Sequence, residues 1–277
     1  ADEVSGQHAG RYWCRRCRWS GRGLLLLALH QGQGDAGRFP WHPHRGIETV
    51  TYLLQGEIER GDSLGNRGII RDNQCQWMTA GSGIIHQEMP QVSERLLGCQ
   101  LWVNLPRQKK MTQPAYRDIK QQDVSVVQEK NAFVRVLSGN YHDHHGAVKG
   151  DYVKVQYLDV TLDSNSIWSY QETSNDQTLF LYLIEGTLAP DDSLGNFEEK
   201  ACAILMSGSS IKSSDYDEVK VKAGNAGARF FLIAAKPLKE PVAWGGPIVM
   251  NTEEELNEAF RELNNKTFIK HDKPQEL

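Results

Sequence analysis

The chain contains an internal repeat, and this repeat is the feature that most restricts its fold. The segment TYLLQGEIERGDSLGN (51–66) returns as LYLIEGTLAPDDSLGN (181–196), 130 positions later. The residues that recur in place are Tyr52, Leu53, Gly56, Asp62, Ser63, Leu64, Gly65 and Asn66. A match of this length at one fixed offset indicates a duplicated structural module.

Both copies predict strands joined by a tight turn. In each copy an apolar run ends at a glycine, a shorter run follows, and Asp-Ser-Leu-Gly-Asn supplies a turn in which Gly65 or Gly195 can take a positive φ. Other segments, such as FVRVLSG, DYVKVQYLDVTL and ARFFLIAA, have the β-branched and aromatic composition of strands. We therefore expect an all-β protein built from two β-barrel or sandwich domains.

The modules and one helix can be given approximate limits. We place the N-terminal domain at residues 1–122 and the C-terminal domain at residues 123–277. A single terminal helix is expected at about residues 252–264, where Thr252 and Glu255 form a capping box and apolar residues follow at helical spacing.

Composition excludes several classes of function. A net charge of −4, with 24% charged and 39% hydrophobic residues, is typical of a soluble globular protein and predicts no direct nucleic-acid partner. The most apolar run, Leu24 to Leu29, is far shorter than the roughly 20 residues of a membrane span, so we expect no membrane partner. Five cysteines are an odd number for a disulfide framework, and we expect a cytoplasmic location.

Two short motifs carry metal-binding side chains. His42 and His44 lie two positions apart, so in a strand they point to the same face with Cα atoms about 7 Å apart. His86 and Glu88 repeat this spacing about forty residues later. If the two strands face each other across a small barrel, three imidazoles and one carboxylate form a complete metal-ligand set.

Each motif has a plainer interpretation when taken alone. The first could be a pair of surface histidines, and the second an ordinary hydrogen-bonded pair. Glu48 could accept an N–H from a ligand imidazole, or it could form an ion pair with Arg45. The occurrence of both motifs in one module, each beside a glycine-rich turn, favours metal binding.

The quoted motifs resemble the pirin family, in the bicupin branch of the cupin superfamily. The similarity rests on HPHRGIETVTYLLQGEIERGDSLGNRG, QWMTAGSGIIHQEM, LWVNLP and GGPIVMNTEEE, and it covers roughly residues 37–270. It implies two cupin-type β-barrel domains of the double-stranded β-helix, or jelly-roll, type, with iron in the N-terminal one. It also implies the ligand set His42, His44, His86 and Glu88.

The corresponding positions in the second copy hold no histidine. They are Glu172, Ser174, Ser213 and Asp215. We therefore expect one divalent metal ion per chain and a C-terminal domain that binds none. Fe(II) follows from the resemblance, whereas the donor set itself would also accept Mn, Co, Ni, Cu or Zn.

The resemblance implies two functions of different classes. Members of the family are associated with quercetin 2,3-dioxygenase activity, which would require a small aromatic, flavonol-type substrate and O₂. Glu88 would then be the catalytic base that accepts the substrate hydroxyl proton. Trp41, Trp77 and Met78 would line the pocket, although packing in a hydrophobic core explains Trp77 and Met78 equally well. The alternative is a non-enzymatic, iron-dependent regulator that binds a protein partner. We expect a monomer, because the duplication already supplies a pair of barrels.

Other donor-rich segments are weaker candidates. The run HDHH (142–145) lies between strands, where an exposed loop is the simpler interpretation, and Cys14 and Cys17 form a lone CxxC without a second pair for zinc. The segment 11–37 departs from the family pattern and has no assigned role.

Overall fold

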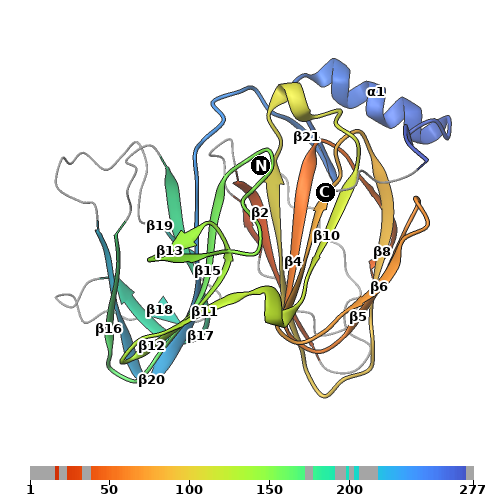
Figure 1. Cartoon of the computed structure of the whole chain (residues 1–277). Helices are drawn as coiled ribbons and strands as arrows, with labels where there is room; N and C mark the ends of the chain where they lie inside the picture. The colour runs from red at the N-terminus through yellow and green to blue at the C-terminus, as the bar shows by residue number, and fades with distance from the viewer. Residues whose placement is uncertain are drawn as a thin grey trace.

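The computed structural model describes residues 16–18, 24–32, 39–171, 177–190, 198–199, 203–205 and 218–272. Within these residues the chain folds into two β domains that lie side by side, with one helix beside the first domain (Figure 1). The prediction of an all-β chain with a single terminal helix is confirmed for the described part of the chain.

The first domain consists of two sheets. The larger sheet has six strands, in the order β1 (Arg16–Arg18), β2 (Leu24–Gly32), β9 (Leu96–Asn104), β4 (Ile47–Gln55), β7 (Gln74–Thr79) and β10 (Ala115–Ile119). The smaller sheet has four, in the order β3 (Phe39–His44), β8 (Ile84–Pro90), β5 (Ile58–Asp62) and β6 (Arg67–Ile70). Side chains of the two sheets meet between them, since Glu88 on β8 accepts a hydrogen bond from Thr51 on β4.

The turn of the first repeat copy forms as predicted. Asp62 Oδ1 accepts hydrogen bonds from the backbone N–H groups of Leu64, at 2.8 Å, and Asn66, at 3.0 Å. Gly65 has a φ of +85°, which a residue with a side chain rarely adopts. The corresponding turn of the second copy, at 191–196, lies outside the described residues.

The second domain is organised around one sheet of eight strands. Its main path runs β11 (Ser125–Gln128), β12 (Ala132–Ser138), β15 (Val155–Leu162), β20 (Glu218–Ala235), β17 (Thr178–Pro190) and β18 (Glu198–Glu199). Two further strands pair with this path, β16 (Ile167–Gln171) with β20 and β19 (Ala203–Leu205) with β17. A short hairpin, β13 (Asn140–Tyr141) and β14 (His144–His145), lies beside it.

The two domains share a core. Tyr52 of the first repeat copy and Tyr182 of the second belong to the same cluster of buried side chains, together with Tyr157 and Phe231. Within this core Tyr52 Oη donates a 2.8 Å hydrogen bond to Asp159 of the second domain. The duplicated strands therefore turn equivalent faces toward each other, and their burial fixes the domains together.

The last part of the chain returns to the first domain. The hairpin β21 (Ala243–Gly245) and β22 (Ile248–Met250) and the helix α1 (Glu253–Asn264) follow the second domain in sequence. Yet Val249 packs in the first domain beside Ile47, Met78, Ala80 and Ile84. The predicted capping box is present, because Thr252 Oγ1 accepts a hydrogen bond from the Glu255 N–H. A domain limit at residue 122 falls between β10 and β11, but it does not describe this returning segment.

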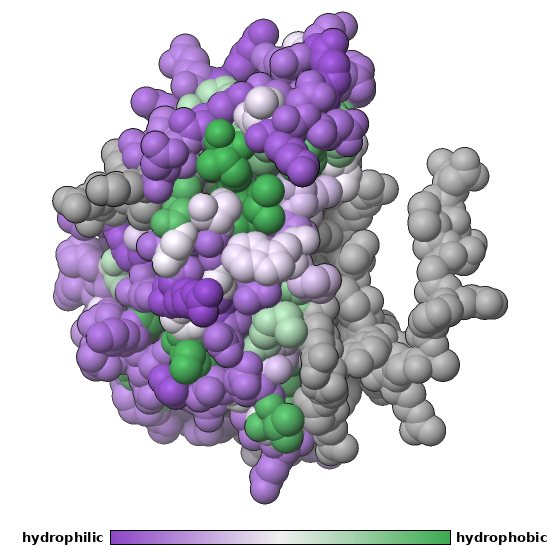
Figure 2. Space-filling view, turned by 90° about the vertical axis from the view of Figure 1, so that its right-hand side faces the viewer, coloured by the Kyte–Doolittle hydropathy of each residue, from purple (hydrophilic) through white to green (hydrophobic). Residues whose placement is uncertain are grey.

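The outer face of the first domain is mainly hydrophilic. Figure 2 shows hydrophobic residues in small groups on this face, with hydrophilic residues around them. Among the described helices, none combines the length and apolarity needed to cross a lipid bilayer.

Candidate metal centre

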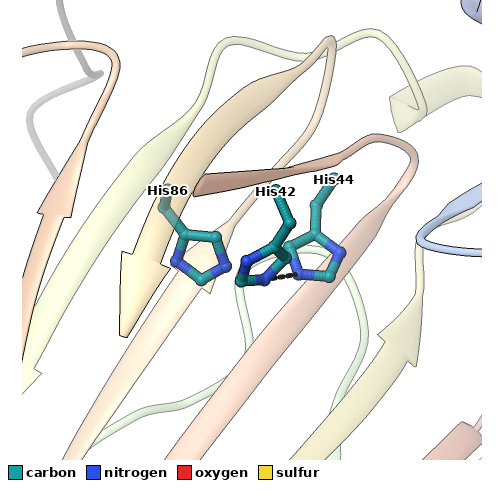
Figure 3. Close-up of side chains that lie close together, drawn as sticks. All are labelled: His42, His44 and His86. Carbon is teal, nitrogen blue, oxygen red and sulfur yellow. Dashed lines mark hydrogen bonds between the residues drawn. The ribbon is translucent and has the colours of Figure 1, made fainter. Parts of the chain in front are cut away.

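Three histidine side chains converge inside the first domain (Figure 3). His42 and His44 lie on β3, and His86 lies opposite His42 on the neighbouring strand β8. One ring nitrogen from each residue lies within 4.8 Å of the other two. The expectation of two strands facing each other across a barrel was wrong in this detail: the strands are hydrogen-bonded neighbours, and cross-strand pairing brings the rings together.

The hydrogen bonds of His42 and His44 indicate which nitrogen of each ring carries the proton. His42 Nδ1 lies 2.8 Å from the Pro40 carbonyl oxygen. His44 Nδ1 lies 3.2 Å from the Pro247 carbonyl oxygen. Because a carbonyl oxygen only accepts, each Nδ1 is assigned as the protonated nitrogen, and each Nε2 then carries a lone pair.

These lone pairs face each other at a spacing that suits a shared cation. The two Nε2 atoms are 3.1 Å apart (Figure 3). Two metal–nitrogen bonds of about 2.1 Å at a right angle would separate their nitrogens by about 3 Å. Neither nitrogen can donate in this tautomer, so a cation between them is the natural partner for both.

His86 adds a third nitrogen donor. Its Nε2 is buried and has no hydrogen-bond partner, which is costly for a polar atom unless a ligand satisfies it. Burial, together with the nearby His42, lowers the pKa of His86 to about 3. Burial, together with His86 and His42, holds the pKa of His44 well below its usual range. Both rings are therefore neutral at neutral pH, which is the form that binds metals.

The three donors fit a divalent transition metal. Imidazole nitrogens suit Fe, Ni, Cu and Zn, and three protein nitrogens leave further coordination positions open. The orphaned Nε2 of His86 and the facing lone pairs of His42 and His44 are what such an ion would satisfy.

Glu88 lies near these histidines but has partners of its own. It follows His86 by two positions on β8, so both side chains point into the domain and both are buried. Glu88 Oε1 accepts a 2.9 Å hydrogen bond from Thr51 Oγ1, and Oε2 accepts a 2.8 Å hydrogen bond from Gln100 Nε2. The carboxylate is not part of the group of three close ligand nitrogens.

Sequence reasoning missed a chain of side chains that connects Glu88 with His44. Trp102 Nε1 donates a 2.9 Å hydrogen bond to Gln100 Oε1, and Gln100 Nε2 also donates to Thr51 Oγ1 at 3.1 Å. The Trp102 ring meets the His44 ring edge-on, with centroids 5.1 Å apart. The available signal was Gln100 in the middle of the largely apolar strand LLGCQLWVN, because a buried glutamine needs polar partners.

Glu48 is not placed to accept a hydrogen bond from a ligand imidazole. Its side chain is fully buried and accepts a 2.7 Å hydrogen bond from Thr79 Oγ1, and burial raises the pKa of its carboxyl to about 7. It alternates with Thr51 along β4 and so lies on the opposite face of that strand. The backbone carbonyl oxygens of Pro40 and Pro247 instead accept hydrogen bonds from the Nδ1–H groups of His42 and His44.

The structure separates the three expected pocket residues. Met78 is buried in one cluster with Trp102, beside the histidines. Trp77 lies on the other face of β7, in the core shared by the two domains. Trp41 is 53% exposed and approaches Gly61 on the outside of the smaller sheet. Trp41 precedes His42 and Trp77 precedes Met78, and adjacent residues of a strand point to opposite faces. Each tryptophan therefore points away from the histidines.

The remaining candidate residues are not gathered into a site. His142, His144 and His145 are exposed, and His142 Nε2 lies 3.2 Å from Glu129 Oε1. Within the described ranges, the one histidine-containing group with metal-binding spacing is that of His42, His44 and His86. Cys14 and the second-copy positions lie outside the described residues: Glu172, Ser174, Ser213 and Asp215.

Comparisons with known families match both halves of the chain. A family model described as Pirin matches residues 28–103, and one described as Pirin C-terminal cupin domain matches residues 157–269. The first match begins after most of the divergent segment 11–37.

Curated relatives and solved structures extend this similarity over most of the chain. Human Pirin is 38% identical over 247 residues, covering 87% of this chain and 81% of its own length. Pirin-1 of Arabidopsis thaliana is 39% identical over 244 residues, with 87% and 82% covered. A crystal structure of quercetin 2,3-dioxygenase from Acinetobacter baumannii has a TM-score of 0.78 and 30% identity, covering 94% of this chain and 97% of that one.

Proposed function

The chain belongs to the pirin family of bicupins, and on that premise we propose that it is a metal-dependent dioxygenase that cleaves flavonol-type substrates such as quercetin. The observation that carries the proposal is the convergence of three buried or half-buried imidazoles whose lone pairs have no protein partner suited to them. The name of the Acinetobacter relative supports the choice of reaction.

The three histidines would hold one divalent ion, and we propose Fe(II). A bound iron would supply open coordination positions and the redox chemistry that reaction with O₂ requires. His42 is the least buried of the three residues, so substrate would reach the site from its side. Metal analysis of tag-free protein tests the identity of the ion against Mn, Co, Ni, Cu and Zn.

Glu88 would act as the proton acceptor for the substrate hydroxyl. Each carboxylate oxygen already accepts one hydrogen bond, from Thr51 or Gln100, and each retains a second lone pair. The two donors fix the orientation of the carboxylate, so that it need not reorganise when the proton arrives. We also propose that one oxygen of Glu88 would be the fourth ligand of the ion, and that its other oxygen would then serve as the base.

Oxygen uptake and carbon monoxide release test the proposal directly. Iron-loaded protein incubated anaerobically with quercetin and then supplied with O₂ should consume O₂ and release CO in equal amounts. Glu88→Gln should retain the metal more fully than His86→Ala, but it should lose turnover. Protein that holds iron and gives neither O₂ uptake nor CO would contradict the enzymatic proposal and favour the regulatory alternative.

A further inference from the structure

We propose that the C-terminal strap, defined as residues 243–270, positions His44 for metal binding and so completes a centre whose ligands all lie in the first domain. The inference rests on the proposed metal site, and it adds a positioning role for residues far from that site in sequence. Lys110 and Arg45 are the side chains that hold the strap in place.

The strap contacts the ligand strand through its backbone. The Pro247 carbonyl oxygen accepts the Nδ1–H of His44 at 3.2 Å, across a sequence separation of 203 residues. Arg45, which directly follows β3, forms an isolated β-bridge with Ile248, and its carbonyl oxygen accepts the Val249 N–H at 3.0 Å. This backbone pairing therefore fixes the position of the Pro247 carbonyl group relative to the His44 ring.

Lys110 joins the strap to the residues that follow the ligand. Its side chain is 2% exposed, and its Nζ donates to the carbonyl oxygens of Gly46, at 2.9 Å, and Val249, at 2.8 Å, and also to Asn104 Oδ1. These three acceptors come from three segments of the chain. Burial lowers the pKa of this amine to about 7, and in the protonated form these acceptors use all three of its N–H donors. The side chain is then a fixed cross-link, because breaking any one bond would leave a buried polar hydrogen unpaired.

Gly46 allows this close approach. Its φ is +75°, and a Cβ atom at this position would lie 2.0 Å from the Val249 carbonyl oxygen. Only a glycine lets the strap pack directly on the backbone two residues after His44.

Arg45 fastens the far end of the strap. Its Nη1 forms a 2.7 Å ion pair with Glu262 on α1, its Nη2 donates to the Phe268 carbonyl oxygen at 2.8 Å, and its guanidinium lies 4.1 Å from the Phe268 ring centroid. The arginine is 2% exposed, so these contacts are made in the interior, where they are least screened by water. The two residues that directly follow His44, Arg45 and Gly46, are thus tied to the part of the strap that follows Pro247.

The consequence for the metal is the tautomer of His44. A carbonyl that accepts the Nδ1 proton keeps the Nε2 lone pair directed at the ion, and loss of such a partner typically costs 10- to 100-fold in metal affinity. Displacing the strap should free the ring to rotate and to exchange its proton between the two nitrogens. A strap that merely stabilised the fold would leave the tautomer unchanged in every variant that still folds.

The experiment measures two quantities: the tautomer of His44 in the metal-free protein, and the affinity of the protein for added Co(II). Nitrogen-15 NMR of full-length, metal-free protein reports which His44 nitrogen is protonated, and titration with Co(II), followed by its visible spectrum, gives Kd. The wild type should show Nδ1–H. Lys110→Met should show mixed tautomers and bind Co(II) about 10- to 100-fold more weakly.

A second variant and a control guard against misfolding. Glu262→Gln loosens the strap from its outer end and leaves Lys110 in place, and it should shift the tautomer and Kd in the same direction. Arg261→Gln changes an exposed residue of the same helix and should leave both at wild-type values. An Nε2–H ring in the wild type, or folded variants with Kd within twofold and an unchanged tautomer, would overturn the proposal. A wild type that shows Nδ1–H but binds no Co(II) would refute the metal site and leave the positioning of His44 by the strap supported.

Discussion

Replacing Gln100 with leucine tests how the carboxylate of Glu88 is held. Gln100 Nε2 donates to Glu88 Oε2 at 2.8 Å and to Thr51 Oγ1 at 3.1 Å, and Gln100 Oε1 accepts from Trp102. Leucine has nearly the same size but removes all three hydrogen bonds. His42 and His44 keep their backbone partners, so the capacity to bind metal should persist.

The expected magnitude follows from the bond to the charged oxygen. A hydrogen bond to an ionised group contributes about 1.5–3 kcal/mol. At about 1.4 kcal/mol for each factor of ten, kcat/KM for quercetin should fall by about 10- to 150-fold if the bond acts fully in the transition state. Stability should also fall by about 1–3 kcal/mol, because the Trp102 N–H loses its acceptor in the interior.

The assay is O₂ uptake at saturating and limiting quercetin, with bound metal measured on the same samples. Gln76→Leu is the matched control, because Gln76 is also buried in this domain but donates to Asp118 at 3.1 Å and not to Glu88. Equal losses of kcat/KM in the two variants, or a loss below twofold in Gln100→Leu, would refute the positioning of Glu88 by Gln100.

Three further predictions concern the metal, the pH dependence and the domain interface. His86→Ala should reduce bound iron to a small fraction of the wild-type content by elemental analysis, and undiminished iron would remove His86 from the centre. Burial raises the pKa of Glu48 from 4.5 to about 7, so the native state retains a proton that the unfolded chain releases. The stability contributed by this group is therefore lost as pH rises from about 4.5 to 7. Glu48→Gln should flatten that part of the stability profile in thermal melts, and an unchanged slope would contradict the raised pKa of Glu48. Asp159→Asn removes the charge that Arg229 contacts at 2.7 Å and weakens the bond from Tyr52, so denaturant unfolding should show a loss of about 3–5 kcal/mol, whereas a loss under 1 kcal/mol would contradict a shared core that depends on this pair.

Local sequence patterns predicted the features that depend on neighbouring residues. The two-residue spacing of His42 and His44 places both rings on one face because strand geometry repeats every two residues. The same rule, applied without knowing which face was inside, could not separate Met78 beside the centre from Trp77 in the shared core. Thr252 and Glu255 predicted the helix start because capping is confined to a single turn.

By itself, the sequence determined the duplicated β modules, the terminal helix and the histidines that meet, since all of these follow from repetition, period and side-chain chemistry read along a short stretch. Tertiary structure alone decided that β3 and β8 are neighbours, that Gln100 and Thr51 hold Glu88, and that Pro247 accepts the proton of His44. Strand order is set by the packing of whole sheets, which residue spacing does not encode. Every residue has a backbone carbonyl, so no residue type in the sequence could indicate that the carbonyl of Pro247 pairs with His44, 203 residues away.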